Sequence, residues 1–169
     1  MHKKTLVAML GFLVLMATAA CSAFEPPAPL TLDVSFLTTE QQTQWTQIQE
    51  KNPGLVSYVA KETENSIIAG YPATRISNIR RAIQAVEMSQ SDQDTMLAVM
   101  ACSSAMRNPF MGEVLARDIA GSPMRDIALI RVVDGYADMN TGRNDALRVL
   151  DMIQGNSAKD AAYASLAKR

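Results

Sequence analysis

Apolar residues recur every three or four positions along most of the chain after position 38, which is the period of helices with one buried face. A clear example is the stretch 74–88, with apolar residues at Ile76, Ile79, Ile83 and Val86. We expect helices over about 39–51, 55–69, 74–88, 95–107, 109–121, 123–140, 144–154 and from 156 or 157 onward. The pattern therefore predicts a single all-α domain over residues 38–169.

Residues suited to helix ends separate these stretches. Thr38 or Thr39 is expected to cap the first helix, with Gln41 or Gln42 completing a capping box. The segment Asn52-Pro53-Gly54 is expected to end that helix.

Two further expectations concern the helix that starts near residue 95 and the face of the first helix. Asp92 or Asp94 is the expected cap of the former, because Asp accepts hydrogen bonds from free N–H groups. Trp45 and Ile48 lie one turn apart in the first helix, and we expect both to face the core.

The first 23 residues follow a different pattern. Basic residues at Lys3 and Lys4 precede an apolar run from Leu6 to Met16 and a tail of small residues from Ala17 to Ala23. These are the parts of a cleavable export signal, and the apolar run is too short to span a bilayer. We therefore assign residues 1–20 to a signal peptide and expect the mature chain to lie in the cell envelope.

Between this signal and the first helix, the chain is rich in proline and then alternates. Three of the four residues from 26 to 29 are proline, and apolar residues follow at Leu30, Leu32, Val34 and Phe36. Alternation with a period of two indicates an extended segment with one apolar edge. We expect residues 21–37 to form an extended tether that lays this edge on the helical domain.

The segment Ala17-Thr18-Ala19-Ala20-Cys21 resembles the lipobox of bacterial lipoproteins, in which small residues precede a cysteine that is acylated and becomes the mature N-terminus. The matching positions are Ala19, Ala20 and Cys21, whereas Thr18 replaces the usual aliphatic residue. The resemblance implies that Cys21 is lipidated and that a lipid anchor holds the chain at a membrane.

Ser22 bears on which membrane this is. In the lipoprotein family, Ser rather than Asp after the cysteine implies the outer membrane, with the helical domain facing the periplasm. The alternative is cleavage by an ordinary signal peptidase after Ala19 or Ala23, which predicts a chain without lipid.

The second half of the chain repeats with a period of about 34 residues. The matched pairs are Ile119 with Ile153, Gly121 with Gly155, Arg125 with Lys159, Asp126 with Asp160, Ala128 with Ala162, and Val132 with Leu166. A shift of 32 residues brings Asp94 and Leu97 into register with Asp126 and Leu129. One helix pair per unit of this length is typical of stacked helical hairpins.

Over residues 88–169 the chain resembles tetratricopeptide-type (TPR-like) helical hairpins. Ala146 matches the small residue where paired helices touch, and Leu150 and Ile153 match the apolar positions after it. The family usually has a small residue, an aromatic residue and a proline at three positions that here are Asp134, Ala137 and Ala158. The resemblance implies stacked antiparallel hairpins forming an α-solenoid, and an irregular helical bundle is the alternative.

Charge and histidine content exclude several function classes. Loss of Lys3 and Lys4 with the signal changes 16 basic and 17 acidic residues to 14 and 17, a net charge of about −3, so nucleic-acid binding is not expected. His2 is the only histidine and lies in the signal, which excludes histidine-based catalysis and metal clusters. Glycine-rich phosphate loops are also missing. We expect no metal, no cofactor and no enzymatic activity.

Carboxylate pairs are the remaining route to catalysis, because two of them held about 5 to 10 Å apart can hydrolyse glycosidic bonds. The candidates are Glu113, Asp118, Asp126, Asp134 and Asp138. Asp134 and Asp138 lie one turn apart with Arg131 nearby, which is typical of a solvated helix face. We therefore assign no catalytic residue.

Sulfur-containing residues allow two readings each. Cys102 lies in the apolar run 97–105 and is expected to be a buried small hydrophobe, while a disulfide with Cys21 is the alternative if cleavage follows Ala19. All eight methionines of the mature chain lie between Met88 and Met152. We expect most of them to fill the core, although methionines also suit surfaces that repack around a partner.

These observations favour an envelope lipoprotein that acts as a protein–protein interaction adaptor, or as an assembly or stability factor of an envelope complex. Stacked hairpins leave a groove that accepts a partner helix or an extended peptide. The alternative is a soluble periplasmic helical bundle that binds a small apolar or lipid-like ligand in its methionine-rich interior.

Overall fold

The computed structural model describes residues 29–70 and 73–168. In these residues eight helices pack against one another and no strand is present, so the predicted all-α fold is confirmed. The helices are α2 (Thr39–Lys51), α3 (Pro53–Ile68), α4 (Ala73–Gln84), α5 (Gln90–Ala105), α6 (Pro109–Arg117), α7 (Ser122–Ala137), α8 (Arg143–Leu150) and α9 (Asn156–Ala167). None of the helices in this part of the chain is long and apolar enough to cross a membrane.

The predicted capping box at the start of α2 is confirmed. The Thr38 hydroxyl accepts a hydrogen bond from the Gln41 backbone N–H (3.3 Å), and the Gln41 side chain accepts one from the Thr38 backbone N–H (2.9 Å). Asn52 alone separates α2 from α3, because Pro53 occupies the first turn of α3, where its missing N–H has no partner to lose. The prediction of a three-residue break there is wrong.

Three predicted helix ends lie too far along the chain. α4 ends at Gln84 rather than 88, and the Val86 N–H then bonds to the Ile83 carbonyl three residues back (3.3 Å). α7 ends at Ala137 rather than 140. α8 ends at Leu150 rather than 154, since the backbone N–H groups of residues 154 and 155 bond to a side chain of α7 instead.

The expectation that Asp92 or Asp94 caps α5 is wrong. Ser89 is the cap, and its hydroxyl accepts a hydrogen bond from the Asp92 backbone N–H (3.1 Å). Asp94 lies one turn further into α5, where it is buried and binds the start of α7. Local sequence could not distinguish these roles, because a cap for the same helix and a cap for a distant helix are the same residue type.

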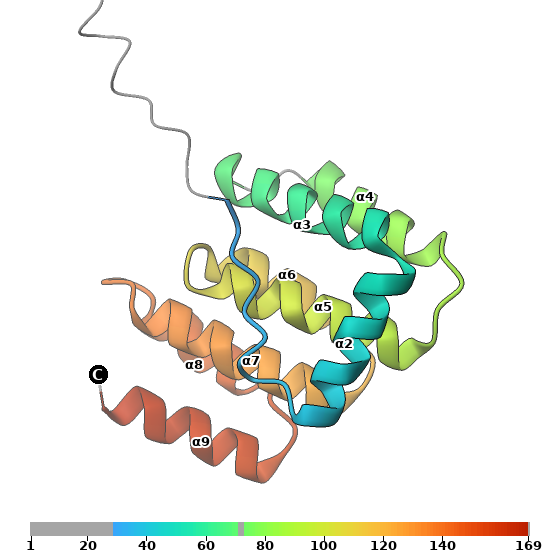
Figure 1. Ribbon diagram of the computed structural model, residues 1–169. Coiled ribbons are helices and arrows are strands. Elements are labelled where there is room, and N and C mark those ends of the chain that lie inside the picture. Colours follow the sequence, from blue (N-terminus) through green and yellow to red (C-terminus); the bar gives the residue numbers. More distant parts are fainter. Residues whose placement is uncertain (1–28, 71–72, 169) are drawn as a thin grey trace, which may run out of the picture.

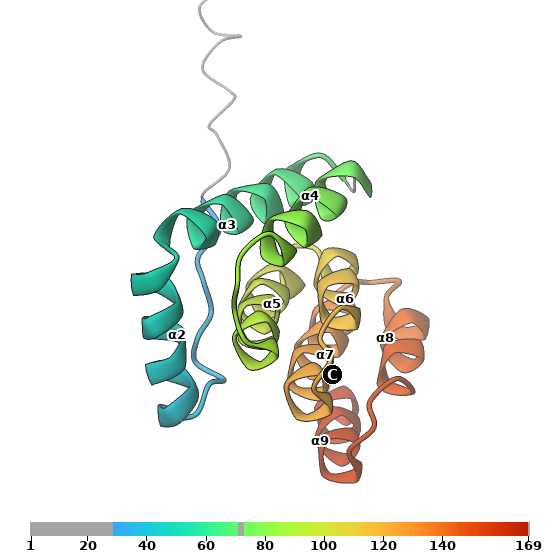
Figure 2. The same ribbon diagram turned by 90° about the vertical axis from the view of Figure 1, so that its right-hand side faces the viewer.

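α5 lies at the centre of the domain and contacts α2, α3, α6 and α7 (Figure 1). Every residue of α5 from Asp94 to Ala105 is buried, which explains why this helix has no polar face. α7 packs on α5 and α6 and also contacts α8 and α9. Viewed from the side, α2 lies on one side of α5 and α6 on the other (Figure 2).

Two glycines allow neighbouring helices to approach α5 closely. A Cβ atom on Gly135 of α7 would lie 2.2 Å from the Ala105 carbonyl oxygen, and one on Gly112 of α6 would lie 3.0 Å from the Ala101 carbonyl oxygen. Only a residue without a side chain fits the first of these positions. The small residue that the sequence lacks at Asp134 therefore stands one residue later, at Gly135.

Candidate protein-interaction groove

An extended segment, residues 29–37, crosses the domain in front of α5 and α7 before α2 begins (Figure 1). Its apolar side chains contact the core as the alternation predicts: Leu37 is buried, and Leu32, Val34 and Phe36 are partly buried against the core cluster. Cys21, the predicted lipidation site, lies outside the described residues.

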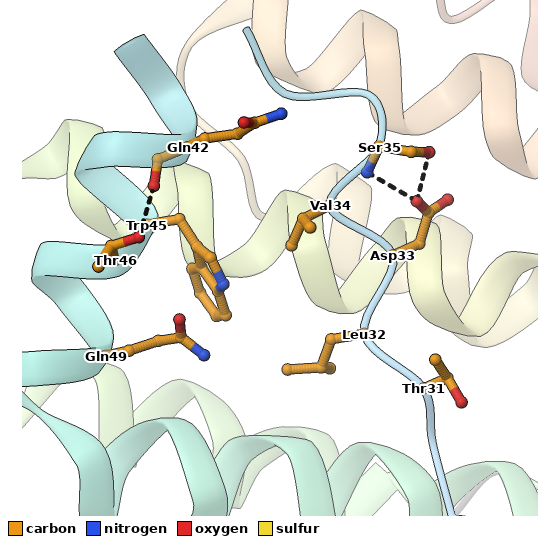
Figure 3. A pocket seen from close by; sticks show the side chains of 9 residues that line it. All are labelled: Thr31, Leu32, Asp33, Val34, Ser35, Gln42, Trp45, Thr46 and Gln49. Atoms are coloured by element: carbon orange, nitrogen blue, oxygen red, sulfur yellow. Dashed lines mark hydrogen bonds between the residues drawn. The ribbon is translucent and has the colours of Figure 1, made fainter. Parts of the chain in front are cut away.

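A groove of about 930 Å³ runs between this segment and α2 (Figure 3). The segment supplies Thr31, Leu32, Asp33, Val34 and Ser35, and α2 supplies Gln42, Trp45, Thr46 and Gln49. Leu32 and Val34 point toward α2, and the Trp45 ring faces them across the groove. The groove therefore has an apolar floor and is open to solvent along one side.

Polar contacts hold the segment wall of the groove against the helices. The Asp33 backbone N–H donates to the Ser103 hydroxyl of α5 (2.7 Å), which in turn donates to the Val99 carbonyl (2.6 Å). Arg131 of α7 lies 3.6 Å from the Asp33 carboxylate and donates to the Ser35 hydroxyl. The wall is thus tied to two helices that are distant in sequence.

The carboxyl group of Asp33 takes part in the same fastening. Partial burial would raise its pKa, but the Ser35 hydroxyl and backbone N–H donate to it (2.6 and 2.9 Å), and Arg131 is nearby. These contacts outweigh burial, so the pKa of Asp33 lies below its ordinary value. Asp33 is therefore charged at neutral pH and remains an acceptor for both residues.

The α2 wall is fixed by its packing on α5. Trp45 and Ile48 are buried, as predicted, at 5% and 2% exposure. The Gln44 amide donates to the Ser91 hydroxyl (2.9 Å) and to the Asp92 carboxylate (2.8 Å) at the start of α5. Both walls are therefore in place without a ligand, which lowers the entropic cost of binding.

The groove combines an apolar floor with amide and hydroxyl groups along its α2 edge. Gln42, Thr46 and Gln49 are exposed there, and Thr31 is exposed on the opposite edge. Amides and hydroxyls both donate and accept hydrogen bonds, as a polypeptide backbone requires. Such a lining fits a peptide with apolar side chains directed into the groove. The alternation over 30–36 was the only sequence signal for this site, and it did not reveal that α2 forms the other wall.

The carboxylates considered as catalytic candidates all have structural partners, beginning with Glu113. Its side chain is buried and accepts two hydrogen bonds from Arg148 of α8 (2.6 and 2.8 Å), one from the Tyr136 hydroxyl (3.0 Å) and one from Arg117. Burial would raise the pKa of Glu113, but these donors outweigh it and the pKa is lowered. Glu113 therefore joins α6, α7 and α8.

The other candidates are dispersed over the domain. Asp118 accepts two hydrogen bonds from Arg80 (2.7 and 2.9 Å), Asp126 binds the start of α9, and Asp134 accepts one from the Ser165 hydroxyl. Asp138 is the C-cap residue of α7. The structure thus assigns each of these side chains a place at a helix end or between helices, and it does not bring a pair of them together in the groove.

Cys102 is a free thiol, buried at 3% exposure, within the part of the chain that the structure describes. Burial raises the pKa of Cys102 to about 12, so the thiol is protonated at neutral pH and is a poor nucleophile. No group of three or more metal-binding side chains occurs among the described residues.

The methionines divide between core and surface. Met96, Met100 and Met111 are at most 1% exposed and fill the core around α5 and α6. Met106 and Met139, at 55% and 50% exposure, lie at the surface near helix ends. Core filling is therefore the main structural use of these residues, as expected.

The chain matches no family model, no curated protein and no solved structure. The groove and the helix contacts are therefore the basis on which a function can be argued.

Proposed function

We propose that this protein is an envelope lipoprotein that binds a segment of a partner protein in the groove between residues 31–35 and α2. The observation that carries the proposal is the pre-formed apolar floor of Leu32, Val34 and Trp45, bordered by exposed amide and hydroxyl groups. A groove of this kind buries apolar side chains of a peptide while its edges bind the peptide backbone.

A lipid anchor at Cys21 would define where this groove works. Ten residues separate Cys21 from Thr31, and an extended chain spans at most about 3.6 Å per residue, so the groove would lie within about 35 Å of the bilayer. We therefore place the partner at or near the membrane, most simply the outer membrane implied by Ser22. An adaptor or an assembly factor of an envelope complex fits this position.

The alternative, a small apolar or lipid-like ligand, has less support. Small-molecule sites usually bury most of the ligand surface, whereas this groove is open along its length. The methionines that suggested an interior site are packed in the core. Binding of a peptide-like partner therefore accounts better for the geometry.

Site-specific photocrosslinking in intact host cells tests the proposal. A photoreactive phenylalanine analogue replaces Gln49, which lines the groove, and in a matched strain it replaces Gln47, which is equally on the exposed surface of α2 but does not line it. We expect a crosslinked protein product at position 49 and little or none at position 47.

The two variants differ by two residues on one helix, so they share expression level, location and labelling chemistry. Equal crosslinking at both positions, or none at position 49, would argue against a groove-bound protein. A position-49 adduct with the mass of a phospholipid would favour the alternative of a lipid-like ligand.

A further inference from the structure

Two buried aspartates make the same contact at successive levels of the domain. The Asp94 carboxylate of α5 accepts hydrogen bonds from the backbone N–H groups of Ala120 and Gly121 (3.0 and 2.7 Å) at the start of α7. The Asp126 carboxylate of α7 accepts them from Gln154 and Gly155 (3.1 and 2.7 Å) at the start of α9. Each aspartate caps the next first helix of the stack, which satisfies N–H groups that a helix leaves free.

The segments that these aspartates receive share a sequence and a reason for it. Each reads isoleucine, any residue, glycine, with Ile119 and Ile153 buried at 1% and 2% exposure. A Cβ atom on Gly121 would come within 2.9 Å of the Asp94 carboxylate, and one on Gly155 within 3.1 Å of the Asp126 carboxylate. Glycine is therefore what lets the helix start approach the carboxylate.

The third aspartate of the series, Asp160, occupies the same fifth position in α9 that the other two occupy in α5 and α7. It is exposed and makes no hydrogen bond or ion pair with any residue that the structure describes. Tyr163 and Ala167 stand 34 residues after Leu129 and Val133, which are fully buried in α7, yet both are exposed in α9. The surface that joins one level to the next thus continues, uncovered, on α9.

The chemistry of this α9 face is unusual for a solvated helix. Its exposed residues are Asp160, Ala161, Tyr163, Ala164, Ala167 and Lys168. Between Asp160 and Lys168 the exposed positions carry alanine and one half-exposed tyrosine and no charge, whereas solvated faces are usually charged. Small side chains allow another helix to approach closely.

The opposite end of the stack is closed. The start of α5 is capped by its own Ser89, and α2 packs on α5 with Gln44 bound to Ser91 and Asp92. In a second copy of the chain, the two helix starts with the isoleucine-x-glycine sequence are already occupied by Asp94 and Asp126. A second copy therefore offers α9 no equivalent partner.

We propose that the outer face of α9 binds a helix of a partner protein, whose first backbone N–H groups donate to the Asp160 carboxylate. The expected partner helix follows an aliphatic residue, any residue and glycine, as α7 and α9 do. This surface uses neither Cys21 nor the groove, so it goes beyond the function proposed above and can fail independently of it.

A probe of known geometry comes from the chain itself. Residues 134–169 are appended after Ala167, so that a second copy of α8 and α9 follows in the 34-residue register and its Gln154 and Gly155 face Asp160. We expect the unfolding midpoint to rise by at least about 3 °C. Asp160→Asn should remove most of this rise in the extended chain and leave the midpoint of the natural chain unchanged. No rise, or equal effects of Asp160→Asn in both chains, overturns the proposal.

The natural partner is sought with a photoreactive analogue at Tyr163 in intact cells, with Tyr58 of α3, which is similarly exposed, as the control position. We expect a product at position 163 whose crosslinked partner peptide begins a helix with the stated sequence. Asp160→Asn should weaken that product about tenfold, the loss expected for charge-assisted hydrogen bonds. A product formed with a second copy of this chain, a product insensitive to Asp160→Asn, or no product overturns the proposal.

Discussion

At the scale of single residues, Asp126 and Asp160 differ in burial alone, since both are the fifth residue of their helices. Asp126 is 4% exposed and binds two backbone N–H groups of α9, whereas Asp160 is exposed. We expect Asp126→Asn to lower the free energy of unfolding by about 1–3 kcal/mol, because an amide cannot accept both hydrogen bonds. Urea unfolding measures this, with Asp160→Asn as the matched control.

The control variant should change the free energy of unfolding by less than about 0.5 kcal/mol, as exposed substitutions usually do. Equal losses for the two variants would mean that the contact between Asp126 and α9 contributes nothing specific.

Glu113 is the other residue whose role depends on distant partners. It binds Arg148, Arg117 and Tyr136, and its side chain is almost fully buried. We expect Glu113→Gln to lower the free energy of unfolding by about 1–3 kcal/mol, since the amide leaves a buried donor facing Arg148. Chemical unfolding at neutral pH tests this.

Asp145 provides the comparison, because it bonds to the same Arg148 but is itself half exposed. Asp145→Asn should cost no more than about 1 kcal/mol, the usual upper value for a surface ion pair. A larger loss for Asp145→Asn than for Glu113→Gln would contradict the assignment of Glu113 as the residue that joins the three helices.

At the scale of elements, the extended segment is held at one backbone point by Ser103. Ser103→Ala removes the acceptor for the Asp33 N–H, and we expect faster hydrogen exchange at Asp33 with a loss of about 1 kcal/mol in unfolding free energy. Ser104→Ala is the control, because the Ser104 hydroxyl is also buried but donates only to the Ala101 carbonyl. Unchanged exchange at Asp33 in Ser103→Ala would show that the segment is held by its apolar side chains alone.

The elements themselves were largely predictable from local signals. The Thr38 capping box and the burial of Trp45 and Ile48 depend on residues within one helix, and both predictions are confirmed. Helix ends set by distant partners were not predictable. α8 stops at Leu150 because the following N–H groups bind Asp126, a contact made across 28 and 29 residues of sequence.

The same distinction explains what the sequence revealed of the candidate site. Alternation over 30–36 predicted one wall, because an apolar edge is a local property. The second wall arises from the packing of α2 on α5, and the Glu113 contacts arise from three helices meeting, which no local pattern encodes. The 34-residue period showed which aspartates are equivalent, and the structure supplied the reason for their equivalence.

At the scale of the whole molecule, pH links several of these contacts. The pKa values of Asp33, Asp92 and Glu113 lie below their ordinary values of 3.8, 3.8 and 4.5. A carboxyl group with a lowered pKa stabilises the fold above its unfolded-state pKa and loses that contribution as the pH falls through its folded-state pKa. We therefore expect the free energy of unfolding to decrease as the pH falls below about 4.5.

Urea unfolding between about pH 6 and pH 3 measures this dependence. The Glu113→Gln variant should show a shallower decrease than the natural chain, because it lacks one of the titrating groups. Stability that rises on acidification, or an identical slope in both proteins, would contradict the proposed role of these carboxylates.

An anchored adaptor places both binding surfaces beside a membrane, and the intact mass of the mature protein from the membrane fraction of its own host tests this most directly. We predict a chain that begins at Cys21 and carries acyl groups, with Cys102 as a free thiol. A mature chain that begins at Ala20 or Phe24 and carries no lipid would contradict the anchor, and would favour a soluble periplasmic protein instead.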